Sequence, residues 1–148
     1  MPMIDVYAAA GTFPDKHALA QNVAAAVMRW EQVPELDLFK HNTAGFVHEL
    51  PADALSNVAG DGNYVRVQVL TPVGALDRDK QLGVVKELTD IIASAAGDPS
   101  LVQRTWVLLT ESPDGGWGLG GHANTGPELA AAARAELAAR AQQSQGGD

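Results

Sequence analysis

The chain begins Met1-Pro2-Met3-Ile4-Asp5-Val6-Tyr7, and this stretch sets the interpretation of everything that follows it. Cytosolic processing usually removes an initiator methionine that stands before a small residue, and proline counts as small. Loss of Met1 would leave Pro2 as an N-terminal secondary amine, a group that titrates at about pH 8 when unperturbed. Such an amine can accept or donate a proton, or attack a carbonyl carbon. The alternative is that Pro2 is an ordinary second residue with no role.

The same stretch has the alternation of a β-strand. Ile4 and Val6 point to one face of that strand, whereas Met3, Asp5 and Tyr7 point to the other. The N-terminal amine is therefore expected at the rim of a sheet, on a rigid element.

A helix and a second strand follow. Thr12 is expected to cap the helix, with Pro14 in its first turn. Apolar residues then recur at helical spacing, at Leu19, Val23, Val27 and Trp30. Residues 43–50 predict a strand that stops at Pro51.

The pattern starts again after a polar, glycine-rich connection. Residues 64–70 alternate strictly and predict a strand, with Arg66 on its polar face. Asp77 is expected to cap a second helix, and Gly97 is expected to end it. Residues 106–111 predict a further strand.

Similarity between the two halves indicates an internal duplication. Asp15-Lys16 recurs as Asp79-Lys80, and His48-Glu49-Leu50-Pro51 recurs as Thr110-Glu111-Ser112-Pro113, at offsets of 64 and 62 residues. In a strand–helix–strand unit the crossover helix makes the two strands parallel. Two such units predict an α+β fold, with a four-stranded mixed sheet and two helices on one face. We assign residues 1–124 to a single domain of two fused units (1–58 and 63–121).

The face of the sheet away from the helices is expected to be partly polar and uncovered. It would carry Arg66 and Gln68, together with Asp5 and Tyr7. Because an unpaired buried charge is costly, Arg66 is expected to pair with Asp5 or Glu111; the alternative is contact with a substrate carboxylate. Symmetric copies of the chain are the simplest cover for such a face, which predicts self-association.

Five glycines surround one Trp and one Leu in residues 114–121, Asp-Gly-Gly-Trp-Gly-Leu-Gly-Gly. This composition predicts a tight hairpin or flap, in which Trp117 is either displayed or packed on its own core. Residues 125–143 predict an Ala-rich helix that begins with a capping box and packs on a neighbouring subunit or on its own. Residues 144–148 predict a disordered tail.

The composition argues against several classes of function. The 148 residues carry a net charge of −8 and no cysteine, which disfavours nucleic acid and anionic membranes as partners and excludes thiolate chemistry. No two of the four histidines (His17, His41, His48 and His122) have metal-ligand spacing, so we expect no metal and no cofactor. No secretory signal or membrane helix is visible, and a cytoplasmic location is expected.

Three of these features together resemble the tautomerase superfamily, which includes 4-oxalocrotonate tautomerase, malonate semialdehyde decarboxylase and the chloroacrylic acid dehalogenases. The features are Pro2 at the N-terminus, the duplicated units and the Trp-Gly-Leu-Gly-Gly segment at 117–121. The resemblance covers residues 2–121. It implies a homotrimer in which a proline is the catalytic group and a small molecule is the substrate.

The sequence departs from this family where its members bind carboxylates. They place arginines in the turn after the first strand of a unit, but the two turns here are Ala8-Ala9-Ala10-Gly11 and Thr71-Pro72-Val73-Gly74-Ala75. A further family arginine aligns with Trp106, and Arg104 lies two residues earlier. We therefore expect weak binding of dicarboxylates. Neutral or singly charged aromatic substrates, such as phenylenolpyruvate, are better candidates because tryptophans can stack on a ring.

The expected function is that of a keto-enol tautomerase, or a related lyase, that uses Pro2 as general acid or base. Trp106 and Trp117 would wall the pocket, and Arg66 or Arg104, from the same or a neighbouring subunit, would supply any positive charge. The alternative is a non-catalytic trimer that binds a small apolar ligand or has a structural role, because the family's carboxylate-binding arginines are missing.

Overall fold

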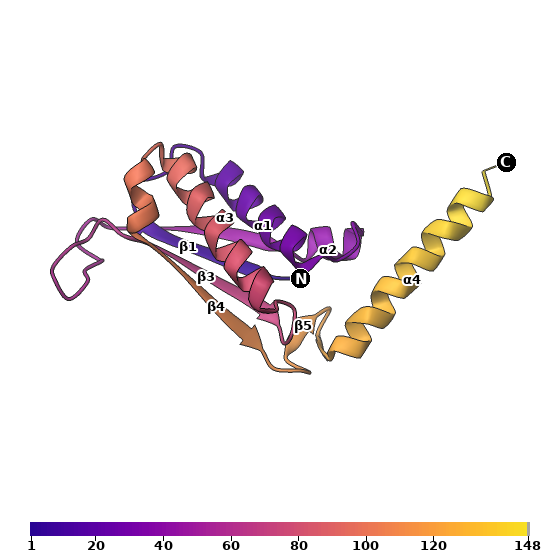
Figure 1. The fold of residues 1–148 in the computed structure, drawn as a ribbon. Helices are drawn as coiled ribbons and strands as arrows, with labels where there is room; N and C mark the ends of the chain where they lie inside the picture. Colours follow the sequence, from indigo (N-terminus) through magenta and orange to yellow (C-terminus); the bar gives the residue numbers. More distant parts are fainter. Residues whose placement is uncertain (148) are drawn as a thin grey trace.

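Two strand–helix–strand units build one four-stranded sheet in the computed structural model, which describes residues 1–147 (Figure 1). The first unit consists of β1 (Met3–Ala9), α1 (Lys16–Glu31) and β2 (Ala44–Leu50), and the second of β3 (Val65–Pro72), α3 (Arg78–Ala96) and β4 (Thr105–Ser112). The strand order is β2-β1-β3-β4. Each unit pairs its own strands in parallel, and β1 pairs with β3 antiparallel. The predicted mixed sheet of an α+β fold is confirmed.

Shorter and later elements complete the described chain. They are α2 (Asp37–His41), the 3-10 helix η1 (Pro99–Gln103), the hairpin strands β5 (Trp117–Leu119) and β6 (His122–Asn124), and α4 (Gly126–Gln145). α4 leads away from the sheet in Figure 1. It ends two residues beyond the expected range of 125–143, so the first two residues of the expected tail are helical. Asp148, the last residue of that tail, lies outside the described residues.

The main core lies between the sheet and the two long helices. Alternate residues of the central strands point into it, and Ile4, Val6, Val67 and Val69 are fully buried. The helices contribute Leu19, Val23 and Val27 from α1 and Val84, Leu88 and Ile92 from α3. Both helices lie on the same face of the sheet (Figure 1), as the sequence predicts.

The helix ends follow the sequence signals with one exception. Asp77 caps α3 with its side chain, and Gly97 ends that helix in the left-handed conformation, at φ 63°. The cap of α1, however, is Asp15 and not Thr12. The Thr12 hydroxyl instead donates a hydrogen bond of 2.6 Å to the Ala9 carbonyl, which ties it to the turn after β1.

The face of the sheet away from the helices carries three rows of side chains, and we call this surface the open face. From β2 to β4 the rows are Ala44, Met3, Leu70 and Thr110; Phe46, Asp5, Gln68 and Leu108; and His48, Tyr7, Arg66 and Trp106. Three of its apolar side chains are well exposed: Phe46 at 46%, Leu108 at 45% and Trp106 at 39%.

The predicted ion pair of Arg66 with a carboxylate is wrong. Its guanidinium donates to the side-chain oxygen of Gln68 at 3.0 Å and lies 5.5 Å from the centroid of the Tyr7 ring. Asp5 pairs instead with Nε2 of His48, at 2.7 Å. Arg66 is exposed in the single chain, so the cost of a buried unpaired charge does not arise there.

The close contact between α1 and α3 depends on Gly83 of α3. A Cβ added to Gly83 would lie 2.1 Å from a ring carbon of Trp30. The indole nitrogen of Trp30 donates a hydrogen bond of 2.6 Å to Glu87. The ring therefore cannot move aside without loss of that bond.

We predict that Gly83→Ala lowers the free energy of unfolding by about 1–3 kcal/mol, because overpacking exceeds the gain of roughly 1 kcal/mol in helix propensity. Denaturant titration measures the change. Ser94→Ala, at an exposed position of the same helix, is the matched control and should shift stability by about 0.5 kcal/mol or less. Unchanged or increased stability of the Gly83 variant would contradict this helix contact.

Candidate functional site

The N-terminus lies inside the protein. Met1 and Pro2 are both buried at the start of β1, and Met1 is only 2% exposed. Met1 belongs to a second apolar cluster, separate from the main core, which we call the N-terminal cluster. Its buried members are Met1, Leu36, Phe39, Trp117, Leu129 and Ala133, and the partly buried Met3, Met28, Val33, Leu38, Leu70 and Leu119 pack against them. Segments far apart in the sequence therefore close around the N-terminus.

A carboxylate in the middle of α4 holds this helix against the N-terminus of α2. Glu136 accepts hydrogen bonds from the backbone N–H groups of Leu38 and Asp37, at 3.0 and 2.9 Å, at the N-terminus of α2. The bond from Leu38 is the main reason that the pKa of Glu136 lies below its usual value. Arg140 adds an ion pair with Glu136 at 2.8 Å. This part of α4 thus packs on its own chain, which places Leu129 over the cluster.

The glycine-rich segment forms the expected hairpin but does not display its tryptophan. β5 and β6 pair antiparallel around Gly120 and Gly121, which have positive φ angles of 61° and 80°. Trp117 is 8% exposed and packs in the N-terminal cluster. Of the two alternatives for Trp117, packing on its own chain is the correct one.

The N-terminal amine meets one buried carboxylate. The Met1 nitrogen lies 3.5 Å from Oε1 of Glu31, the last residue of α1, and the Glu31 side chain is 4% exposed. Burial lowers the pKa of the amine and raises the pKa of Glu31, and the attraction between the two groups opposes both shifts. Lys80 of α3 adds a weaker attraction to Glu31.

Of the residues predicted to bind substrate, the structure brings only Trp117 to the N-terminal cluster. Arg66 and Trp106 share one row of the open face near the far end of β1, about 17 Å from Pro2 at about 3.3 Å per residue. Trp106 stacks on Tyr64, with ring centroids 4.6 Å apart. Within one chain neither residue reaches Pro2, and a contact from a neighbouring subunit stays a prediction.

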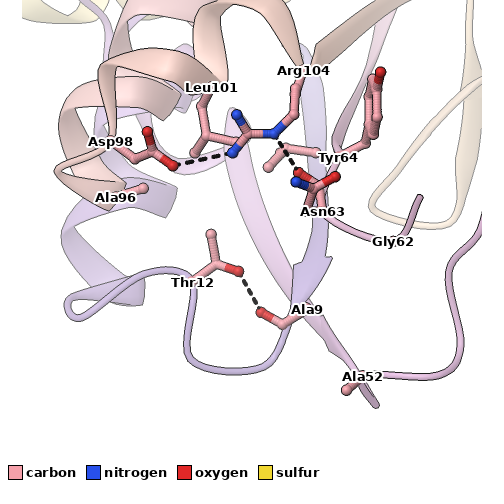
Figure 2. A pocket seen from close by; sticks show the side chains of 11 residues that line it. Ala9, Thr12, Ala52, Gly62, Asn63, Tyr64, Ala96, Asp98, Leu101 and Arg104 are labelled. Atoms are coloured by element: carbon pink, nitrogen blue, oxygen red, sulfur yellow. Dashed lines mark hydrogen bonds and ion pairs between the residues drawn. The ribbon is translucent and has the colours of Figure 1, made fainter.

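Arg104 lines a different cavity, of about 400 Å³, at that far end of the sheet (Figure 2). Its guanidinium donates from Nε to the Asn63 carbonyl at 3.0 Å, from Nη1 to the Ser100 hydroxyl at 2.6 Å and from Nη2 to the Asp98 carboxylate at 3.1 Å. All three guanidinium nitrogens are thus used to hold the chain around η1. In the single chain Arg104 has a structural role.

Sequence reasoning missed Glu31, Leu36 and Phe39 as parts of this region. The last two lie in a segment that the sequence presents only as a short link, and Glu31 belongs to no motif. One signal points to Glu31: it follows Val27 by one turn, on the buried side of α1, where a carboxylate requires a partner.

Residues 1–147 contain no group of three or more His, Cys, Asp or Glu side chains placed to hold a metal ion. In the same residues no helix combines the length and the apolar character that crossing a membrane requires.

The arrangement of strands and helices matches solved structures of low sequence identity. A fused 4-OT protein, described as an asymmetric trimer, is 20% identical with a TM-score of 0.67, over 86% of this chain and 98% of that one. A member of the cis-3-chloroacrylic acid dehalogenase family is 17% identical with a TM-score of 0.69, over 97% and 99%. Malonate semialdehyde decarboxylase is 17% identical with a TM-score of 0.63, over 88% and 97%.

The chain has the tautomerase-superfamily fold. The resemblance inferred from Pro2, the duplicated units and the glycine-rich segment is thereby confirmed for the fold. No protein-family model matches the sequence, and no curated protein matches it.

For this tautomerase-fold chain we predict that Trp117→Ala opens the N-terminal cluster. The substitution should lower the free energy of unfolding by about 3–5 kcal/mol, as for other buried aromatic side chains. It should also speed acylation of the N-terminal amine at fixed pH, measured by mass spectrometry of the N-terminal peptide. Leu82→Ala, at an exposed position of α3, is the control and should leave the acylation rate unchanged. Equal acceleration in both variants would contradict the assigned position of Trp117.

Proposed function

We propose that the chain is a proton-transfer enzyme in which Pro2, made N-terminal by removal of Met1, acts as general acid or base on a small keto or enol substrate. The observation that carries the proposal is the burial of the N-terminus in an apolar cluster at the start of a rigid strand. Burial favours the neutral form of an amine, which is the form that accepts a proton. The likeness to tautomerase-superfamily enzymes supports the same chemistry.

Met1 would prevent this chemistry for as long as it remains. Its side chain fills the N-terminal cluster, and its peptide bond with Pro2 removes the basicity of the proline nitrogen. Removal of Met1 would free the amine and vacate space beside Trp117 for a substrate. We propose a cytoplasmic location, where such processing takes place.

A non-catalytic, ligand-binding role is the second candidate. Neither turn that follows β1 or β3 contains an arginine, and Arg66 and Arg104 lie at the far end of the sheet. The clamp for carboxylates that the family resemblance implies is therefore missing from the single chain. The two candidates differ in one requirement, since only the enzyme needs a free amine on Pro2.

We further propose that three copies assemble through the open face. The two edge strands of this face expose apolar side chains, Phe46 on β2 and Leu108 and Trp106 on β4, and the polar side chains of Asp5 and Gln68 lie between them. Several well-exposed apolar side chains on one sheet face fit a surface that is covered by further copies of the chain. The similar fused 4-OT protein is described as a trimer. A neighbouring subunit is then the expected source of any arginine that contacts the substrate.

We predict that protein starting at Pro2 accelerates ketonisation of phenylenolpyruvate or of its methyl ester, and that Pro2→Ala lowers kcat/KM by about 10²–10⁴-fold, the usual contribution of general acid–base catalysis. A dicarboxylate substrate should be turned over more slowly. Intact mass establishes where each preparation begins. Protein that retains Met1 is the matched control and should be inactive. Full activity in the Pro2 variant, or in protein that retains Met1, would exclude this mechanism.

Two leucines of similar exposure allow the proposed trimer to be tested. Leu108 is 45% exposed on the open face, and Leu82 is 55% exposed on α3. We predict that Leu108→Glu reduces the mass in solution from three chains to one, because a buried charge without a partner disfavours the interface. Leu82→Glu should leave the trimer intact. Light scattering measures both, and a wild-type protein that is monomeric at micromolar concentration would refute the trimer.

A further inference from the structure

We infer that Glu31 is the second proton-transfer group of this site, facing Pro2 across the space that Met1 fills, and that the substrate held between them is an apolar enol or ketone without a carboxylate. The inference rests on the proposed role of Pro2. It adds the chemical class of the substrate and a named partner for the proline.

Glu31 is buried beside the N-terminus. Its side chain is 4% exposed, and among the described residues its hydrogen-bond partner is the Met1 amine, at 3.5 Å. The apolar cluster that contains Met1 is built from α2, the hairpin and α4 as well as the end of β3. Loss of Met1 would remove both the partner and the side chain that fills this space. The carboxyl group of Glu31 and the amine of Pro2 would then lie on opposite sides of it.

The arrangement is costly for stability, which indicates a role in chemistry. Glu31 is the last residue of α1, where the helix dipole disfavours negative charge. Its burial removes solvation that a single hydrogen bond does not replace. Both effects favour the protonated carboxyl group, in agreement with the raised pKa of Glu31. A protonated carboxyl group beside a neutral amine provides one donor and one acceptor of protons.

The same charges restrict the substrate. The charged groups that act on Glu31 are the N-terminal amine and, more weakly, Lys80 of α3. A substrate carboxylate in this space would either meet the charge of Glu31 or lose its solvation beside apolar side chains without an arginine. A neutral aromatic or aliphatic enol incurs neither cost. Trp117, Phe39 and Leu36 would contact its apolar surface.

Proton transfer balances within the site. The neutral amine of Pro2 takes the proton from the enol oxygen, and the O–H electron pair forms the carbonyl π bond. The electrons of the carbon–carbon double bond take the proton of the Glu31 carboxyl group, which forms a C–H bond and leaves a carboxylate. After the ketone leaves, the Pro2 ammonium returns a proton to Glu31. The reaction is an isomerisation and consumes no further reagent.

The test uses protein that starts at Pro2 and compares wild type with Glu31→Gln, Glu31→Asp and Glu35→Gln. Glu35 lies four residues further along and its side chain is 83% exposed, so Glu35→Gln makes the same substitution at the surface. Phenylenolpyruvate and its methyl ester differ only in the free carboxylate. We expect the ester to be preferred about tenfold or more and Glu31→Gln to lower its kcat/KM about 10²-fold or more. Glu31→Asp should recover part of that loss, and Glu35→Gln should be nearly unchanged.

A second measurement does not depend on turnover. Titration of ¹⁵N-labelled Pro2 by NMR gives the pKa of its amine directly. Because two interacting groups titrate as a pair, Glu31→Gln leaves Pro2 to titrate alone and should change its pKa by about one unit or more. Glu35→Gln should not change it.

The outcomes separate the two proposals. If Pro2→Ala is inactive but Glu31→Gln keeps full activity and the same Pro2 pKa, the role of Glu31 is refuted and the proposed function stands. Preference for the acid over the ester refutes the substrate class. Full activity in Pro2→Ala refutes the proposed function and this inference with it. If wild type turns over neither compound, the substrate class is refuted and the titration alone decides whether Glu31 faces Pro2.

Discussion

The antiparallel pairing of β1 with β3 is the constraint on which the rest of the structure depends. Because the strands within each unit are parallel, β1 and β2 start at the end of the sheet where β3 and β4 finish. The segment before β2 and the hairpin after β4 must therefore meet at the start of β1. Glu31 and Trp117 arrive beside Met1 from opposite directions along the chain. The N-terminal cluster is thus a consequence of the strand topology.

The same topology creates an equivalent place at the other end of the sheet, where β3 starts. β3 starts 62 residues after β1 (65 − 3), so Tyr64 is the residue of the second unit that corresponds to Pro2 in the first. Its nitrogen is in a peptide bond, so this end cannot supply a free amine. The cavity there is lined by Arg104, whose guanidinium nitrogens are bound to neighbouring groups. Of the two ends of the sheet related by the duplication, only the start of β1 can provide a free amine for catalysis.

Local features of this fold could be predicted because their causes are local. The alternation of Ile4 and Val6 and the caps at Asp77 and Thr125 depend on neighbours within a few residues. The site could not be predicted in this way. Glu31 and Trp117 are 86 residues apart in sequence (117 − 31), and both reach Met1 only through the pairing of the strands. The expectation for Arg66 was wrong because it assumed burial, whereas the open face is exposed in the single chain. Family resemblance identified the fold from a few motif residues, but it carried no information about Glu31.

A structural role explains a buried amine and carboxylate poorly. Two apolar residues of similar volume in their place are often as stable or more so, because both ions lose solvation on burial. The same loss brings the pKa values of the two groups closer together, which reduces the free-energy difference between the ion pair and the neutral pair. The amine in this pair belongs to Met1, and removal of Met1 would leave the Pro2 amine as the group that shares the site with Glu31. Isomerisation of an enol requires two such groups, since one must accept a proton while the other donates one. The proposed chemistry therefore accounts for a carboxylate that packing alone would disfavour.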